Sequence, residues 1–227
     1  MVSVRALATL ARSPRTGVPI VLTSGSALLA FVLMTIASVA SAIAASRVAE
    51  ATDVNALFFS ETRQPWVQTL LDQLGPDRTA VILYLVQRSY DAVIVATAIT
   101  PLFVWLLGSS AIHASARLGG IRRPYGPFLV FFAYATALTL TPASVATLVF
   151  GAGQAPTASI AGAIGWACLL WLGFIAFRAI QTHYAVSGDK AVRILVIAIV
   201  LFYVVPLVLI VLAAVAIVIA ALVLNYF

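Results

Sequence analysis

Five long apolar segments dominate the sequence and constrain its fold more than any other feature. An α-helix needs roughly 20 mostly apolar residues to cross the hydrocarbon core of a bilayer, and each segment is long enough. Only 9% of the residues are charged and the mean hydropathy is +1.11, far from the values of soluble domains. The sequence therefore predicts a membrane protein with five spans, at residues 18–45, 91–110, 128–150, 157–177 and 194–224.

The composition of these segments favours helices over a membrane barrel. They are rich in Leu, Ala, Ile and Phe, and they lack the alternation over about ten residues that barrel strands show. A helix also satisfies its backbone hydrogen bonds within the segment, as the bilayer requires. We therefore predict an all-α, polytopic fold, with a basic segment at residues 1–17 and a single five-helix transmembrane domain at 18–227.

The positive charges predict the orientation of the chain. Nine cationic residues flank the spans on one side: Arg5, Arg12, Arg15, Arg117, Arg122, Arg123, Arg178, Lys190 and Arg193. The other side receives four: Arg47, Arg63, Arg78 and Arg88. Lys and Arg in short loops stay in the cytoplasm. The N-terminus is therefore expected in the cytoplasm and, after five crossings, the C-terminus outside.

Two features near the N-terminus have alternative interpretations. Ala42-Ile43-Ala44 resembles the cleavage site of a signal peptide, but the apolar run of 28 residues that contains it exceeds the roughly 7 to 15 of a signal sequence. We expect a retained span. Residues 1–17 are either a short helix on the inner leaflet, ended by Ser13-Pro14, or a plain basic tail that only sets the orientation.

The connections contain three further signals. In the outer amphipathic loop 46–90, Pro65 begins a helix and Gly75-Pro76 ends it. The apolar run after Asp77 extends the second span outward, so that Arg88 and Asp91 lie three residues apart on one helix face and can pair, either near the membrane interface or facing the bundle. Gly119-Gly120 permits the turn between the second and third spans.

Polar side chains in the third span indicate a helix that faces the bundle interior. Pro142 removes a backbone donor there, and we expect a threonine hydroxyl to satisfy a carbonyl that it frees. Because ionisable groups inside a membrane usually have a function, the pair in the second span joins the candidates for this interior. The bundle-interior candidates are Arg88, Asp91, Tyr134, Thr136 and Thr139.

The sequence carries no common catalytic motif. It contains no HExxH, GxSxG, P-loop or GxGxxG pattern, and Cys168 is its only cysteine. We therefore expect neither an enzyme nor a cofactor or metal centre. His113 and His183 both follow span ends, which leaves a haem or metal held between them as an alternative.

The order of short motifs resembles the Yip (Ypt/Rab-interacting protein) family of five-span membrane proteins. The motifs are Ser13-Pro14, then His113, Ala116 and Gly119-Gly120, then Tyr134-Ala135, then Trp166, Leu170, Gly173, Ala179, His183, Ser187 and Lys190-Ala191. The resemblance implies five helices with a cytoplasmic N-terminus and, in eukaryotic members, association with small GTPases. Only about 17 residues precede the first span, so we do not carry the GTPase role over.

These observations favour a non-enzymatic protein of the cytoplasmic membrane that acts through lipid or protein contacts, as a scaffold, assembly or envelope-homeostasis factor. Its expected partners are anionic lipid headgroups on the cytoplasmic side, and also a membrane protein or a second copy of the chain, but not nucleic acid. The alternative is a permease or channel-like subunit that uses the polar third span. The residues expected to contact lipid or partner are Arg12, Arg15, Arg117, Arg122, Arg123 and Arg193.

Overall fold

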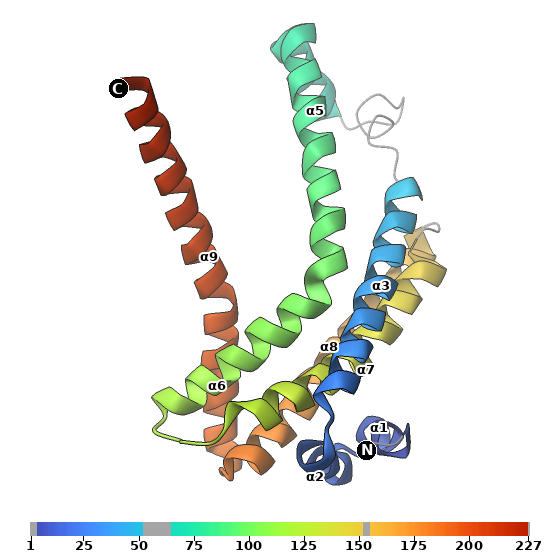
Figure 1. Ribbon diagram of the computed structural model, residues 1–227. Helices are drawn as coiled ribbons and strands as arrows, with labels where there is room; N and C mark the ends of the chain where they lie inside the picture. Colours follow the sequence, from blue (N-terminus) through green and yellow to red (C-terminus); the bar gives the residue numbers. More distant parts are fainter. Residues whose placement is uncertain (1–3, 52–64, 152–154, 227) are drawn as a thin grey trace. The chain divides into compact units, whose positions relative to one another are not determined.

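The described chain is almost entirely helical (Figure 1). The computed structural model describes residues 4–51, 65–151 and 155–226, and no strand occurs among them. The elements are α1 (Val4–Arg12), α2 (Pro14–Ser24), α3 (Ala27–Ala51), α5 (Pro65–Phe103), the π-helical turn η1 (Val104–Gly108), α6 (Ser109–Leu118), α7 (Tyr125–Phe150), α8 (Ala155–Tyr184) and α9 (Gly188–Tyr226). The all-α prediction is confirmed.

Five of the described helical stretches are long and apolar enough to cross a membrane. They are Ala27–Ala51, Arg78–Leu118, Tyr125–Phe150, Thr157–Tyr184 and Gly188–Ala216. Each contains most of one predicted apolar segment, so the prediction of a multi-pass protein is confirmed. The second stretch begins at Arg78, which agrees with the predicted outward extension of that span.

The first predicted span differs from the structure. We expected one continuous helix over residues 18–45, whereas α2 ends at Ser24 and α3 begins at Ala27. Gly25 between them has an extended backbone, with φ −61° and ψ 132°. A ring from α7 fills this break, since the Tyr134 hydroxyl accepts a hydrogen bond from the Ser26 N–H at 3.1 Å and donates to the Ser26 carbonyl at 2.9 Å. The break therefore has its polar groups satisfied.

The first two helices form a hairpin. In α1 the buried residues Ala6 and Leu10 lie on one face, and Arg12 in its last turn is exposed. α2 approaches that face at Gly17, where an added Cβ would lie 2.4 Å from the Leu10 Cα. The chain near the N-terminus thus contains the predicted short helix rather than a plain tail, and glycine is what allows the two backbones to approach.

Two glycines with positive φ end helices where the sequence predicted turns. Gly75, at φ 73°, interrupts the helical path of α5. Gly120, at φ 77°, follows α6 and donates to the Arg117 carbonyl at 2.9 Å, and Ile121 donates to the Ala116 carbonyl at 3.1 Å. This pair of bonds is the Schellman arrangement, in which a left-handed residue lets the last carbonyls of a helix find donors. It turns the chain toward α7.

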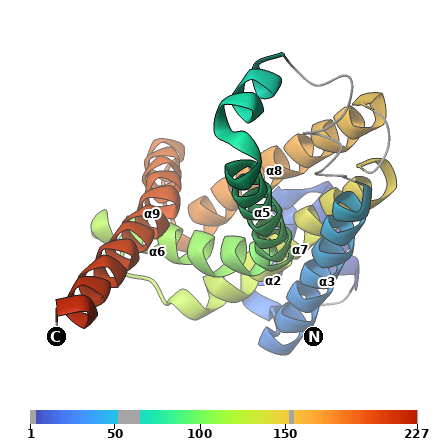
Figure 2. The ribbon, with the colours of Figure 1, turned by 90° about the horizontal axis from the view of Figure 1, so that it is seen from above.

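The contacts of the chain divide it into two units. Unit 1 contains residues 1–30, 103–135 and 173–227, and unit 2 contains residues 31–102 and 136–172. In unit 1, α6 packs against the N-terminal part of α9, where Ser115 Oγ donates to the Ile194 carbonyl at 2.9 Å (Figures 1 and 2). In unit 2, α3, α5 and α7 line a groove of about 300 Å³.

A proline in α5 frees a carbonyl that α3 satisfies. Pro101 has no N–H to donate to the Thr97 carbonyl one turn before it. Ser41 Oγ donates to that carbonyl at 2.8 Å instead. We expected such a bond beside Pro142 in the third span, where Thr139 donates to the Thr136 carbonyl at 3.2 Å. The bond at Pro101 is of the same kind, and its donor comes from a different helix.

Candidate functional site

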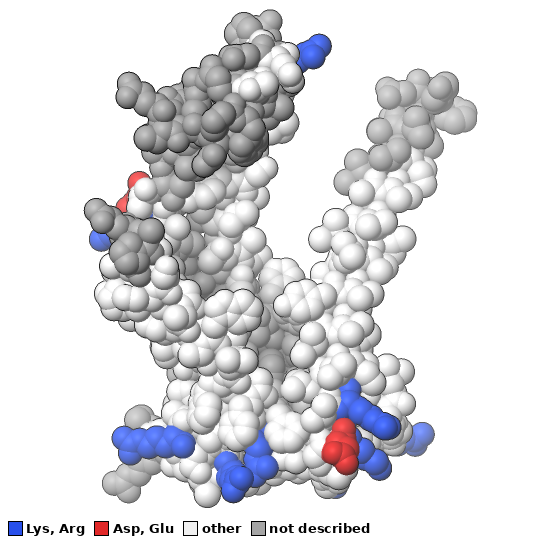
Figure 3. All heavy atoms as spheres, turned by 180° about the vertical axis from the view of Figure 1, so that it is seen from behind, with Lys and Arg blue, Asp and Glu red and all other residues white. Residues whose placement is uncertain are grey.

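The described basic side chains of unit 1 gather at one end of that unit (Figure 3). Six of them are the predicted lipid or partner contacts, and all six are exposed. They come from four places in the chain: the α1–α2 junction, the last turn of α6, the turn before α7 and the start of α9. The six residues are Arg12, Arg15, Arg117, Arg122, Arg123 and Arg193. Helix ends from separate parts of the sequence thus build one surface, which we call the basic end.

The charge of this unit is strongly unbalanced. All nine cationic residues of the predicted cytoplasmic side lie in the segments of unit 1, together with a single acid, Asp189. The four cationic residues of the predicted outer side lie in the segments of unit 2. Among the side chains described in unit 1, no cation forms an ion pair. The guanidinium groups of the basic end therefore keep N–H donors for an anion.

A layer of rings lies beneath the basic end. His113 is centred 4.8 Å from the Tyr125 ring and 6.1 Å from the Tyr184 ring, while Phe128 is centred 5.5 Å from His183 and 5.4 Å from Tyr184. Phe128 and Tyr184 are buried. The rings join the ends of α6, α7 and α8, so they fix the helix ends that carry the cations.

Hydrogen bonds connect the two histidines to the basic residues. Arg117 Nε donates to His113 Nε2 at 3.4 Å, which makes that nitrogen an acceptor. The proton of the neutral ring is then on Nδ1, which donates to the Tyr184 hydroxyl at 3.0 Å. His183 Nε2 donates to the Pro124 carbonyl at 3.0 Å, next to Arg123. Both histidines therefore position the basic end.

These bonds change the interpretation of the histidines. With both nitrogens of His113 engaged, the ring has no lone pair left for haem iron or another metal. Within the part of the chain that the structure describes, no three His, Cys, Asp or Glu side chains come together as a metal site would need. The sequence reasoning missed the positioning role, although His113 and Arg117 are four residues apart and thus neighbours on a helix.

A hydroxyl network supports the same helix ends. Ser109 Oγ donates to the Trp105 carbonyl of η1 at 2.6 Å, so it accepts from the Tyr125 hydroxyl at 2.9 Å. Ser110 Oγ lies 2.8 Å from the same hydroxyl. Trp105 Nε1 donates to the Leu129 carbonyl at 2.8 Å. The π-helical turn, whose carbonyls are unusually placed, is thereby tied to α7.

The bundle-interior candidates separate into two groups. Tyr134, Thr136 and Thr139 are buried, with exposed fractions of 0%, 0% and 2%. Arg88 and Asp91 differ from the expectation of an interior position, because their side chains are 65% and 46% exposed. They form the predicted pair, with Arg88 Nη1 3.7 Å from Asp91 Oδ2. Their charges are costly to bury, and the helical spacing lets them pair at the surface of α5 instead.

Comparison of the chain with protein-family models, with curated proteins and with solved structures finds no match. The resemblance to the Yip family stays a prediction.

Proposed function

We propose that this chain is a non-enzymatic, multi-pass protein of the cytoplasmic membrane that binds anionic lipid headgroups at its basic end, as a scaffold, assembly or envelope-homeostasis factor. The observation that carries the proposal is the collection of nine cations and one acid in unit 1, without an ion pair among its described side chains. A juxtamembrane cation contributes about 1 kcal/mol near an anionic leaflet. Several such cations together should therefore retain anionic lipid at the basic end.

The division of charge between the units also supports the proposed orientation. Nine cations lie in the segments of one unit and four in those of the other, and this asymmetry supports an N-terminus in the cytoplasm. A Yip-like identity agrees with five spans and a cytoplasmic N-terminus. We propose it as a family resemblance without GTPase binding.

Lipid retention tests the headgroup proposal. The Arg122→Gln/Arg123→Gln variant removes two exposed cations, so its affinity for anionic lipid is expected to fall about 10- to 30-fold at low salt. Native mass spectrometry of the purified protein after exchange into mixed lipids measures the bound fraction. The matched control, Arg63→Gln/Arg78→Gln, removes the same charge from the other loop and should retain anionic lipid. Equal retention by all three proteins would refute the proposal.

Cysteine labelling tests the orientation. In a Cys168→Ala background, Glu50→Cys is expected to react with an impermeant thiol reagent added to intact cells, whereas Gly119→Cys is expected to react only after lysis. Gly119 is a suitable position because its φ of −77° is open to any residue, and Glu50 is exposed at the end of α3. The reverse pattern would place the basic end outside and contradict the proposal.

The permease alternative has weaker support. A polar path needs hydroxyls that face the substrate, but the Tyr134 and Thr139 hydroxyls donate to backbone carbonyls. Thr136 Oγ1 is a buried hydroxyl without a hydrogen-bond partner among the described residues. A single orphan hydroxyl does not make a path, so we do not propose transport.

A further inference from the structure

His113 is half-buried near the end of α6, and both of its ring nitrogens have partners. Its Nδ1–H donates to the Tyr184 hydroxyl at 3.0 Å, and its Nε2 lone pair accepts from Arg117 Nε at 3.4 Å. Only the neutral ring with its proton on Nδ1 makes both bonds, because the charged ring has no lone pair. The position of Arg117 is therefore coupled to the protonation state of His113.

A second proton on His113 replaces this attraction with a repulsion. Nε2 then carries a hydrogen that faces the Nε–H of Arg117, and the two side chains have like charges. Arg117 is exposed in the last turn of α6, so its guanidinium is able to turn away from the ring. Tyr184 keeps its bond, since Nδ1 donates in both states of the ring. Protonation therefore releases Arg117 and leaves the histidine in place.

The surroundings of His113 leave the new charge without a carboxylate partner. Its ring centre lies 4.8 Å from that of Tyr125 and 6.1 Å from that of Tyr184. Among the described side chains, neither histidine of the chain forms an ion pair. The titratable and charged groups that face the two histidines are Arg117 of α6, Tyr125 of α7, Tyr184 of α8 and Arg123 of the turn before α7. A charged His113 therefore adds to the positive charge of the basic end.

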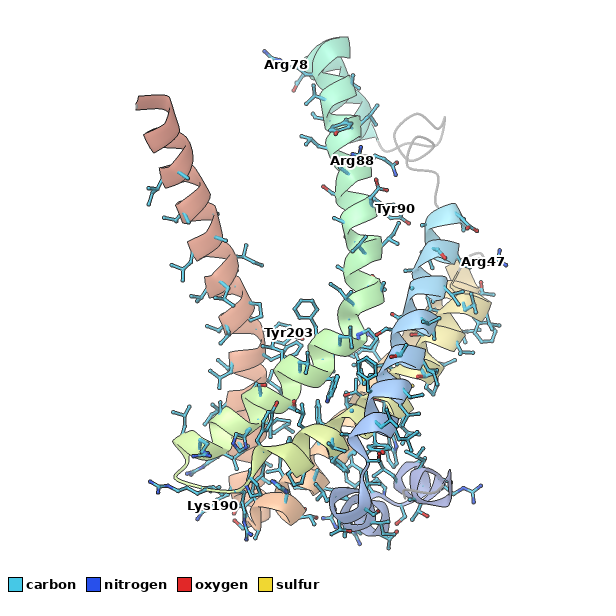
Figure 4. All side chains as sticks on the ribbon, viewed as in Figure 1. Arg47, Arg78, Arg88, Tyr90, Lys190 and Tyr203 are labelled. Carbon is cyan, nitrogen blue, oxygen red and sulfur yellow. The ribbon has the colours of Figure 1, made fainter. Side chains whose placement is uncertain are left out.

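α9 packs against the opposite face of α6. Ser115 Oγ donates to the Ile194 carbonyl of α9, and Ser115 is about 200° around the helix from His113. The charged residues at the start of α9 are Asp189, Lys190 and Arg193, and Lys190 lies at the basic end (Figure 4). The contact with α9 thus leaves the face of His113 to the rings of α7 and α8.

We propose that His113 makes the basic end a pH-sensitive site, which holds anionic lipid headgroups more tightly under mildly acidic conditions. This regulation rests on the proposed lipid function of the basic end. The charged ring supplies one additional cation, and the released Arg117 has all its donors available for a phosphate. One juxtamembrane cation raises the affinity for an anionic leaflet about 5-fold. Histidine changes its charge between about pH 8 and pH 5, so the effect belongs to that range.

Lipid binding at two pH values tests the regulation. The biotinylated full chain is held on beads in mixed micelles of detergent and phosphatidylcholine, and radiolabelled phosphatidylglycerol is added at about pH 7.5 and about pH 5. The phosphate of this lipid keeps its negative charge at both values. Its affinity for the protein should rise about 5-fold at the lower pH. Equal affinity at both values would overturn the regulation alone, whereas no preference for phosphatidylglycerol at either value would overturn the lipid function as well.

Glutamine substitutions separate the contributions of the two histidines. His113→Gln keeps an acceptor for Arg117 but does not titrate, so most of the rise in affinity at low pH should be lost. The matched control, His183→Gln, should keep most of the rise, because glutamine still has a donor for the Pro124 carbonyl. A full rise in His113→Gln, or its loss in His183→Gln, would overturn the assignment to His113.

Histidine NMR tests the same arrangement without lipid. The chain has two histidines, so His183→Gln leaves His113 as the single histidine in the spectrum. At about pH 7.5 the ring carbon and nitrogen shifts should indicate a proton on Nδ1, the tautomer that the bond from Arg117 requires, and at about pH 5 they should indicate the charged ring. A proton on Nε2 at the higher pH, or a ring that stays neutral at the lower pH, would overturn the regulation.

Discussion

Replacing Gly17 with alanine is expected to open the α1–α2 hairpin and to destabilise the protein by about 3 kcal/mol, at the upper end of overpacking costs. The new Cβ would lie 2.4 Å from the Leu10 Cα and 2.5 Å from its backbone nitrogen. No rotamer change relieves a clash with backbone, so α1 must move away and expose Leu10. Thermal unfolding of the purified protein measures the loss, and faster tryptic cleavage after Arg12 reports the detached helix.

Gly162→Ala provides the matched control for this prediction. Gly162 lies within α8 and has no atom within 4 Å of the position that a Cβ would occupy. Alanine there should stabilise the helix by about 0.5–1 kcal/mol, because it restricts the unfolded chain more than glycine does. The two variants therefore have opposite expected signs. If both unfold at the same temperature, close approach at Gly17 does not hold the hairpin together.

Replacing Ser41 with alanine is expected to lower the free energy of unfolding by about 1–3 kcal/mol. This is the usual penalty for a buried polar group without a partner, here the Thr97 carbonyl. The serine is 7% exposed, and its hydroxyl donates to the Thr97 carbonyl that Pro101 leaves free. Ser46→Ala is the control, because Ser46 is exposed and donates to Ile43 in its own helix. Ser46→Ala should change the free energy of unfolding by no more than about 0.5 kcal/mol. Chemical unfolding in a mild detergent measures both.

A double-mutant cycle identifies the physical cause of the Ser41 effect. Pro101→Ala restores a backbone N–H that can bond the Thr97 carbonyl, so the serine hydroxyl becomes dispensable. The Ser41→Ala/Pro101→Ala protein should then be more stable than the sum of the single changes predicts, by about 1 kcal/mol or more. Strict additivity would mean that the serine stabilises the protein by some route other than this carbonyl.

The features that the sequence predicted depend on residues close together in the chain. The five spans follow from the length and hydropathy of single segments. The helix ends at Gly75 and Gly120 were predictable because they depend only on the backbone conformation of those two residues. The pair of Arg88 and Asp91 follows from helical spacing. The nine cations predicted for one side precede the first span or follow the second and fourth, and all nine lie in the segments of unit 1.

The features that the sequence did not reveal depend on residues far apart in the chain. The break at Gly25 lies within an apolar run, and its polar groups are satisfied by Tyr134, more than a hundred residues away. Pro19 and the short polar stretch from Thr23 to Ser26 were the available local signals. The acceptor of Ser41 lies in another helix, so hydropathy alone does not indicate that bond.

Because α9 is long, we expect the thickness of the bilayer to affect how this protein sits in the membrane. At 1.5 Å per residue, the apolar stretch 194–224 is about 46 Å long, whereas the stretch 157–177 of α8 is about 32 Å. A hydrocarbon core of about 30 Å accommodates the shorter stretch almost upright, but the longer one must lean strongly, bend at Pro206 or thicken the lipid around it. Thick, ordered membranes should therefore relieve a mismatch that thin ones impose.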